Sequence, residues 1–246
     1  MRELAFMGLP IIACLFAARH SLRVRGPALT GLFFLCAITF SGLRGVVDAN
    51  RPASEMAQIT HLDLWLSATG RDYGTFLVMM PALRSALAYL CLLIAERACP
   101  PRNVGALRLC AFALLAHAML GALLEAFGQS LGWWEYQQTA EVDPGVMYHF
   151  IKGINWSGGI FQPFFLARVE SERIERPMVV AGYYMGGYFG LLTIFTLLNP
   201  SLRTIVFGPF NVALVLTGFF VKGPPLSPLR LRNAPDESQP IVADAT

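Results

Sequence analysis

Long apolar stretches recur along this chain, and short charged clusters separate them. This pattern constrains the fold most strongly, because a helix needs about 20 mostly apolar residues to cross the hydrocarbon core of a bilayer. Charged residues make up 14% of the chain, against about 25% in an ordinary soluble domain. The mean hydropathy of +0.52 agrees with this deficit. The sequence argues against a soluble domain, a disordered chain and a secreted disulfide scaffold, and predicts a polytopic membrane protein.

Seven apolar segments approach the length of a spanning helix, so the predicted fold class is all-α, a polytopic transmembrane helical bundle of about seven spans. The expected spans are 4–18, 28–47, 74–95, 109–127, 150–167, 177–198 and 204–221. The first is either an uncleaved signal anchor or a tilted helix. Residues 53–68 are too polar to span and are a candidate interfacial helix. Residues 1–222 are expected to form one transmembrane domain, followed by a disordered tail over 223–246.

The basic residues predict the orientation of this bundle. Four segments hold three of them each, together 12 of the 19 in the chain. They are the first, third and fifth loops and the C-terminal tail, which share one side only if there are seven spans. Cytoplasmic loops carry an excess of Lys and Arg, so the N-terminus is expected outside and the C-terminus in the cytoplasm. The residues are Arg19, Arg23, Arg25, Arg97, Arg102, Arg108, Arg168, Arg173, Arg176, Lys222, Arg230 and Arg232.

Several function classes lack the residues that they require. No basic stripe interleaved with aromatic residues is present, so nucleic acid is not a predicted partner. The sequence has no aspartate-rich pair, P-loop, HExxH or GxSxG motif, and no metal or other cofactor is predicted. The five cysteines form no CxxC pair. The predicted partners are the lipid bilayer and a lipophilic small molecule, and the oligomeric state stays open.

Ionisable residues within the spans need an explanation, because each costs about 2.5–3.5 kcal/mol on insertion scales. Arg44 and Asp48 are four residues apart, and form either a self-neutralising pair or part of a site. Arg84 is expected near the bilayer centre with no acid within four residues of it. His117 and Glu125 share a face of the fourth span, and the histidine alone suggests a packing residue. Glu125 is either a proton donor or a counter-ion to a nearby cation.

The fifth span carries a polar stripe, which must face the bundle interior because lipid would leave its donors unpaired. Side chains of the sixth and seventh spans are expected to complete this cavity. The stripe consists of His149, Lys152, Asn155, Trp156, Gly159 and Gln162, and its expected neighbours are Tyr184, Tyr188 and Asn211. The sixth span also has glycines at GxxxG spacing, which predicts packing inside the bundle. These are Gly182, Gly186, Gly187 and Gly190.

The segment between the fourth and fifth spans contains the run GWWEY. Trp133, Trp134 and Tyr136 are either an interfacial aromatic belt or a lid whose rings line a hydrophobic site. Aromatic faces stabilise a cation by roughly 0.5–2 kcal/mol each, so such a lid suits a developing carbocation. Glu135 is either a second acid–base carboxylate or a solvated loop charge.

An acidic residue near a helix end is followed here by glycines, an aromatic run and a second polar helix. The residues are Glu125, Gly128, Gly132, Trp133, Trp134 and Tyr136. This arrangement, within residues 113–158, resembles small integral-membrane carotenoid and terpenoid cyclases and hydratases. The resemblance implies a compact helical bundle in which a buried acid protonates an alkene or epoxide, and a base or water quenches the cation. The PxEE-type acidic motif of lycopene cyclases is absent.

The leading hypothesis is an integral-membrane enzyme that acts on a lipophilic isoprenoid-type substrate by acid–base chemistry, through cyclisation, hydration or isomerisation. One alternative is a small-molecule or proton-coupled transporter, and another is a non-catalytic assembly protein whose polar stripe only joins helices. The predicted catalytic residues are Glu125, Glu135, Asp48, Lys152 and His149. The predicted substrate-binding residues are Arg44, Arg84, Trp133, Trp134, Tyr136, Asn155, Trp156, Tyr184 and Tyr188.

Overall fold

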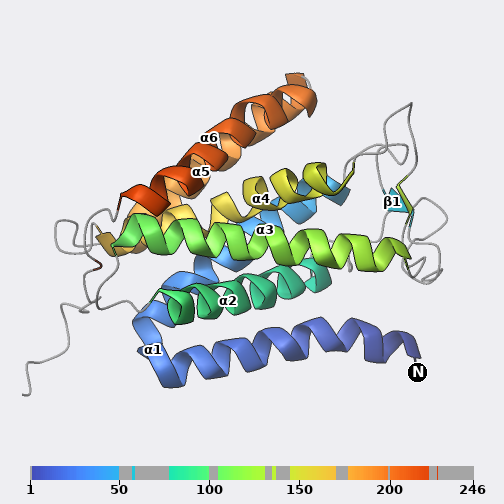
Figure 1. The fold of residues 1–246 in the computed structure, drawn as a ribbon. Coiled ribbons are helices and arrows are strands. Elements are labelled where there is room, and N and C mark those ends of the chain that lie inside the picture. Colours follow the sequence, from blue (N-terminus) through green and yellow to red (C-terminus); the bar gives the residue numbers. More distant parts are fainter. Residues whose placement is uncertain are drawn as a thin grey trace, which may run out of the picture.

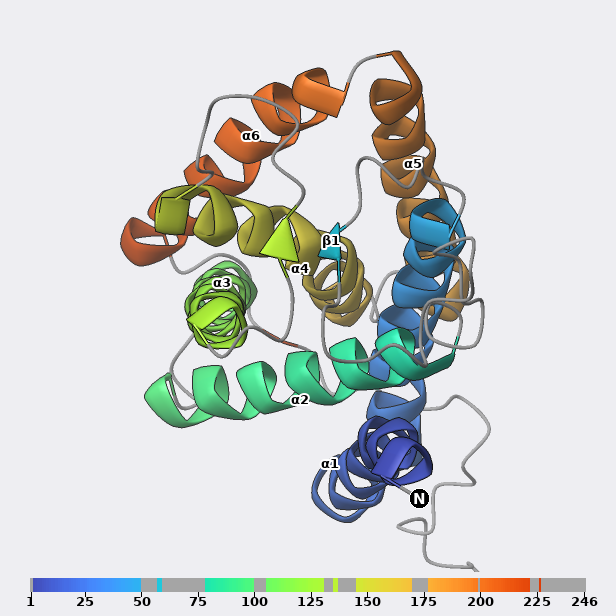
Figure 2. The same ribbon diagram turned by 90° about the vertical axis from the view of Figure 1, so that its right-hand side faces the viewer.

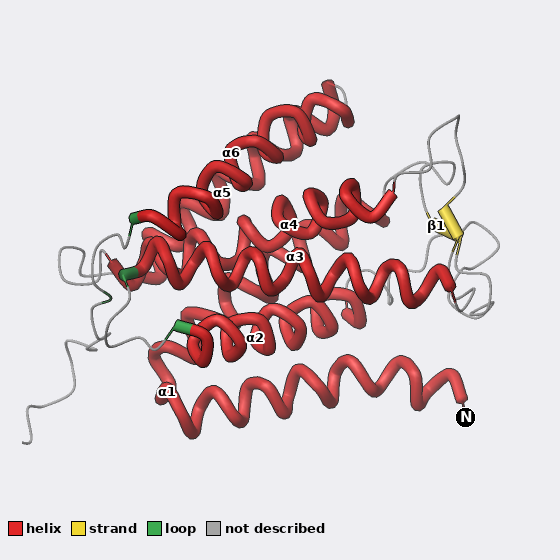
Figure 3. Tube along the Cα trace, in the orientation of Figure 1, coloured by secondary structure: helices red, strands yellow, loops and turns green. Residues whose placement is uncertain are grey.

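A computed structural model describes residues 2–49, 57–58, 78–99, 105–130, 135–136, 145–169, 177–198, 200–221 and 226. The helices are α1 (Arg2–Ala49), α2 (Met80–Ala98), α3 (Ala106–Ser130), α4 (Gly145–Val169), α5 (Pro177–Leu198) and α6 (Pro200–Phe220). The two-residue strands β1 (Ala57–Gln58) and β2 (Glu135–Tyr136) pair antiparallel. Apart from this strand pair and a few residues at or beyond helix ends, the described chain is helical, as Figure 3 shows, and the all-α prediction is confirmed for it.

Helix α1 is two helical arms that meet at Gly26. This glycine has φ 78° and ψ 175°, a region that essentially only glycine occupies. Pro27 follows it and begins the second arm, where the fixed φ of proline suits a first helical turn. We call residues 2–25 arm 1 and residues 27–49 arm 2. The predicted first loop, with Arg19 and Arg25, is therefore wrong, because the Gly–Pro pair turns the chain at one residue.

The seven helical arms of the described chain overlap the seven predicted spans and alternate in direction (Figure 1). Arms 1 and 2 join at one end of the bundle, and the strand pair lies at the other end. Helix α4 lies among the others, as Figure 2 shows, and contacts α1, α3, α5 and α6. The predicted polar stripe is thus carried by the most enclosed helix.

Aromatic rings fill the centre of the bundle. Phe33 of arm 2 lies with its ring centroid 6.4 Å from that of Phe161 and 5.3 Å from that of Phe164, both on α4. All three side chains are completely buried. Phe40 reaches the backbone of α4 at Gly159, where an added Cβ would overlap its ring. Close contact between arm 2 and α4 therefore depends on this glycine.

The predicted interfacial helix over residues 53–68 is wrong at its described positions. Ala57 and Gln58 form β1, in which Ala57 faces Tyr136 and Gln58 faces Glu135. An extended backbone leaves its N–H and C=O groups without helical partners, and pairing with β2 satisfies them. The remaining residues of that range lie outside the described ones.

The expectation that the α5 glycines pack inside the bundle is also wrong. A Cβ added at Gly182, Gly186, Gly187 or Gly190 would meet no atom within 4 Å. The buried face of α5 is formed instead by Ala181, Met185 and Tyr188, which recur at helical spacing. These larger side chains fill the interface, so the glycines lie on the other side of the helix.

Two helical stretches in the described part of the chain are long and apolar enough to cross a membrane. They are Gly8–Leu43 and Ala106–Leu124, with mean hydropathies of 1.6 and 1.9. The first includes the Gly26 turn and therefore consists of two arms. A buried helix of a soluble protein meets the same criteria, so length and composition do not decide between the two environments.

Candidate functional site

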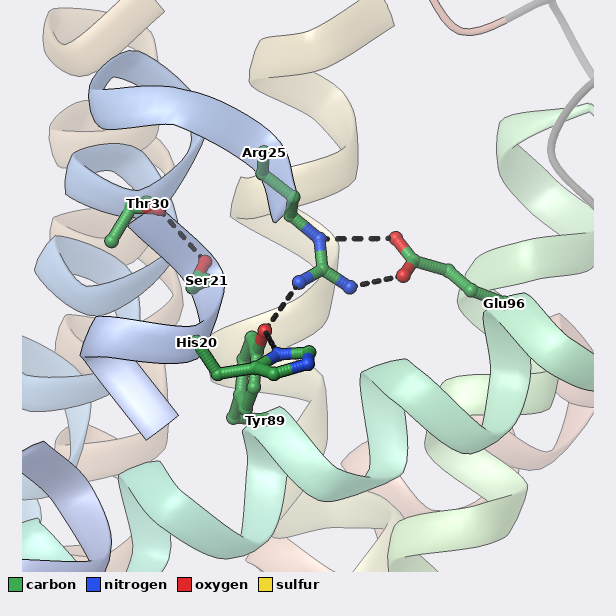
Figure 4. A network of polar contacts seen from close by, with 6 residues as sticks. All are labelled: His20, Ser21, Arg25, Thr30, Tyr89 and Glu96. Atoms are coloured by element: carbon green, nitrogen blue, oxygen red, sulfur yellow. Dashed lines mark hydrogen bonds and ion pairs between the residues drawn. The ribbon is translucent and has the colours of Figure 1, made fainter. Parts of the chain in front are cut away.

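Arg25 joins arm 1 to α2 at the end of the bundle where the two arms of α1 meet (Figure 4). Its guanidinium pairs with both carboxylate oxygens of Glu96, with an Nε to Oε1 distance of 3.3 Å. Its Nη1 donates to the Tyr89 hydroxyl at 2.6 Å, and that hydroxyl lies 2.8 Å from His20 Nδ1. The pair is bidentate, which is the geometry that distinguishes arginine from lysine. This network fixes the relative position of two helices.

Two further arginines lie at the same end. Arg108, at the start of α3, donates to the carbonyls of Gly218 and Phe219 at 3.3 and 2.9 Å, near the end of α6. Burial lowers the pKa of Arg168, at the end of α4; Glu96 raises it, and Arg25 lowers it. Arg25, Arg108 and Arg168 come from three of the four segments predicted to share a side. Their placement at one end, which we call the basic end, is confirmed.

A buried cluster of amides and phenols joins α4, α5 and α6. Gln162 Nε2 donates to Asn211 Oδ1 at 2.5 Å, and the Tyr184 hydroxyl donates to Gln162 Oε1 at 2.6 Å. Asn211 Nδ2 donates to the Tyr188 hydroxyl at 3.3 Å. A Cβ at Gly158 would lie 2.8 Å from Asn211 Oδ1, so this glycine makes room for the cluster. The prediction that these four side chains meet is confirmed.

This amide cluster has the properties of a helix-joining network. Gln162 and Asn211 use both donor and acceptor atoms within it. Such hydrogen bonds between transmembrane helices contribute about 0.6 kcal/mol on average. The two tyrosine rings stack with their centroids 6.4 Å apart. None of the four side chains is a carboxyl group, so the cluster itself supplies no strong acid.

His117 on α3 lies in the interior at a different position. It is 7% exposed, and its ring meets Phe161 edge-on at a centroid distance of 6.3 Å. The Gly153 backbone and the Arg84 charge both interact with the ring. The ring nitrogen Nδ1 is buried without a hydrogen-bond partner in the described part of the chain. His117 therefore packs in the interior as predicted, but its hydrogen-bonding groups are not all satisfied by the described residues.

Two serines that the sequence did not single out also have a buried polar atom without a hydrogen-bond partner among the described residues. The atoms are Ser41 Oγ on arm 2 and Ser85 Oγ on α2. A buried polar group left unsatisfied costs about 1–3 kcal/mol. A single serine in an apolar run is indistinguishable from a small packing residue, so no sequence signal marks either one.

The other predicted site residues are placed only by their backbone. Arg44 and Asp48 lie in arm 2, Glu125 in α3, and His149, Lys152, Asn155 and Trp156 in α4, and Glu135 and Tyr136 form β2. Their side chains, and all of Trp133 and Trp134, lie outside the described residues. The predicted convergence of the charged candidates therefore stays a prediction. The inward orientation of the stripe is confirmed at Gly159 and Gln162, which are buried.

No group of three His, Cys, Asp or Glu side chains that could hold a metal ion occurs among the described residues. Comparisons with protein-family models, with curated proteins and with solved structures found no match. The resemblance to carotenoid and terpenoid cyclases rests on the sequence motif alone.

Proposed function

We propose that this chain is a multi-pass integral-membrane enzyme that acts on a lipophilic, isoprenoid-type substrate by acid–base chemistry.

The membrane location is supported by the direction in which apolar side chains point. Met119, Leu123 and Phe127 occupy successive turns of α3 and are 53%, 64% and 55% exposed. Arms 1 and 2, α2, α5 and α6 also expose large apolar side chains, whereas Gln162 and Asn211 are buried. Extended apolar surfaces of this kind are rare on soluble monomers, and the hydrocarbon core of a bilayer is the solvent that suits them.

The basic end is the proposed cytoplasmic side, because cytoplasmic segments carry the excess of Lys and Arg. Single cysteines in a background without the five native ones test this orientation. A membrane-impermeant maleimide should label Ser54→Cys in intact cells and label Ser171→Cys only after permeabilisation. Recovery of the chain in the soluble fraction, or equal labelling of both sites, would contradict the membrane location.

The reaction is supported by one observation above the others, the burial of His117 in the bundle interior, where the Arg84 charge acts on it. Position 125 follows His117 by two helical turns, so helical register puts it on the same face of α3. We therefore assign the proton donor to Glu125. The aromatic residues predicted to shield the cation are Trp133, Trp134, Tyr136 and Trp156.

The proposed reaction begins when the carboxyl group of Glu125 protonates an alkene of the substrate, which leaves a carboxylate and a carbocation. In a cyclisation or isomerisation, the cation then loses a proton to a base, and a new carbon–carbon double bond forms. In a hydration, water adds to the cation and loses a proton. Glu135, Asp48, Lys152 and His149 are the candidates for the base, and Asn155, Arg44 and Arg84 for positioning the substrate.

Glu125→Gln tests this assignment, because it keeps the size of the side chain and removes its acidic proton. In membranes supplied with substrate, product formation should fall by about 100-fold or more while protein abundance stays constant. Glu172→Gln is the matched control, since the same change in a predicted cytoplasmic loop should leave turnover unchanged. Unimpaired turnover by Glu125→Gln would contradict the assignment of Glu125 as the proton donor.

A further inference from the structure

Arm 1 lies at the edge of the bundle beside α2 (Figures 1 and 2). The side of arm 1 that packs on the bundle carries mostly small side chains. Ser21 is completely buried there, and its Oγ lies 2.8 Å from Thr30 Oγ1 of arm 2. The packed positions recur at helical spacing and are Cys14, Ala17, Ala18, Ser21 and Arg25. The side chains on the opposite side of arm 1 are exposed.

This exposed side changes from apolar to basic along the helix. Ile12, Leu15 and Phe16 are 50%, 64% and 66% exposed. Arg19 and Arg23, in the last two turns of arm 1, are also exposed. Steps of three and four residues join these five positions, so they lie on one side of the helix. We call these five residues the outer face of arm 1.

The two arginines of the outer face have no counter-ion in the described chain. Neither Arg19 nor Arg23 forms a hydrogen bond or ion pair with the described residues. Glu96 is the one acidic side chain described at the basic end, and it is occupied by Arg25. Residues at i and i+4 have Cβ atoms about 5–6 Å apart, so the two guanidiniums repel each other. A bound anion would remove this repulsion.

We propose that the outer face of arm 1 binds an anionic phospholipid of the cytoplasmic leaflet. The phosphate accepts hydrogen bonds from the guanidiniums of Arg19 and Arg23, whose planar fork suits phosphate oxygens. An acyl chain lies along Phe16, Leu15 and Ile12, toward the bilayer centre. Apolar side chains followed by basic ones match the order of acyl chains and headgroups in one leaflet. This inference rests on the proposed membrane location and not on the proposed reaction.

Native mass spectrometry of the full-length protein in detergent tests this inference, because it counts bound lipids. The probes are phosphatidylglycerol and phosphatidylcholine with the same acyl chains, and inorganic phosphate. Phosphatidylglycerol should bind about tenfold or more tightly than phosphatidylcholine, because basic residues at the membrane surface attract headgroups with a net negative charge. Inorganic phosphate should not displace it, because only a lipid also covers the apolar side chains. Equal affinities for the two lipids, or displacement by an equal concentration of inorganic phosphate, would overturn the proposal.

Substitutions separate the outer face from general attraction of anions. Arg19→Gln and Arg23→Gln should each lower the affinity for phosphatidylglycerol by about fivefold and leave that for phosphatidylcholine unchanged. Arg97→Gln is the matched control, because Arg97 is an exposed arginine at the same end of the bundle but on α2. An equal loss of affinity in Arg97→Gln would contradict the proposal. Where one of the two variants does not fold, the other decides the test.

The inference and the proposed function can fail separately. A selective loss of phosphatidylglycerol in Arg19→Gln together with unimpaired turnover by Glu125→Gln would remove the catalytic assignment and keep the lipid site. Maleimide labelling of Ser54→Cys and Ser171→Cys as expected, together with equal affinities for the two lipids, would keep the membrane location and remove the lipid site.

Discussion

The Gln162 amide on α4 donates to Asn211 Oδ1 on α6 over 2.5 Å, and both side chains are buried. The two residues are 49 positions apart in sequence, so only the packing of α6 against α4 brings them together. Tyr184 and Tyr188 of α5 occupy the remaining positions of this cluster. Three helices are thereby fixed in one register by polar contacts rather than by shape alone.

Gln162 and Asn211 should therefore be coupled in stability. A double-mutant cycle of Gln162→Leu and Asn211→Leu is expected to give a coupling energy of about 0.6 kcal/mol, with about 1.7 kcal/mol as the upper value for such pairs. Reversible unfolding in detergent measures the four free energies of unfolding. A cycle of Gln162→Leu with the exposed Ser130→Ala provides the uncoupled reference. Strict additivity of the Gln162 and Asn211 changes would contradict the network.

Gly26→Ala should lower the free energy of unfolding by about 1–3 kcal/mol, because φ 78° with ψ 175° is strained for any residue with a Cβ. No neighbouring atom lies within 4 Å of the added methyl group, so the cost is conformational. A Cβ added at Gly8 in arm 1 would also have no atom within 4 Å, but Gly8 lies in a regular helix. Gly8→Ala should therefore raise the free energy of unfolding by up to about 1 kcal/mol, because alanine has the higher helix propensity. Thermal unfolding in detergent compares the two. Effects of the same sign would contradict the strained turn at Gly26.

Gly153→Ala should loosen the contact between α3 and α4. The added Cβ would lie 2.9 Å from the Ala118 Cα, a backbone atom that cannot turn away, and overpacking of this kind costs about 1–3 kcal/mol. Gly121→Ala is the matched change on α3, since its Cβ would meet nothing within 4 Å. Unfolding in detergent should show a loss for Gly153→Ala only. Comparable effects of the two substitutions would contradict the close approach.

Arg25 and Glu96 should each be costly to neutralise, since their side chains are only 7% and 19% exposed. Glu96→Gln leaves the Arg25 guanidinium without its counter-ion and should cost about 3–5 kcal/mol. The double change Arg25→Gln with Glu96→Gln should cost less than the sum of the single changes. Arg97→Gln, at an exposed neighbouring position, should change stability by less than about 0.5 kcal/mol. A loss in Arg97→Gln equal to that in Glu96→Gln would argue against a specific pair.

The sequence predicts most of the helices, because runs of apolar residues reflect local composition alone. The inward face of α4 was also predictable, since Gly159 and Gln162 repeat at helical spacing. The Gly26–Pro27 pair favours a turn at a single residue. The basic residues before it instead indicated a longer loop, which is why the turn was not predicted. The glycine face of α5 was misinterpreted because spacing alone does not say which face has a partner.

Contacts between distant segments could not be predicted from the sequence. The Arg25–Glu96 pair joins residues 71 positions apart, and no local rule selects this partner among the available acids. The β1–β2 pair depends on how two long connections meet. Ser41 and Ser85 become notable only when burial leaves their hydroxyls without partners. Each of these features is decided by tertiary packing.

Enzymatic activity on an isoprenoid is tested most directly by comparing lipid extracts from cells with and without expression of this chain. A membrane enzyme that cyclises or isomerises an isoprenoid adds a product of unchanged mass, and one that hydrates it adds a product heavier by one water. We expect such a product with the natural chain and with Glu172→Gln, and its loss with Glu125→Gln. Identical lipid extracts, with the protein present in the membrane and a supplied isoprenoid unchanged, would contradict this activity.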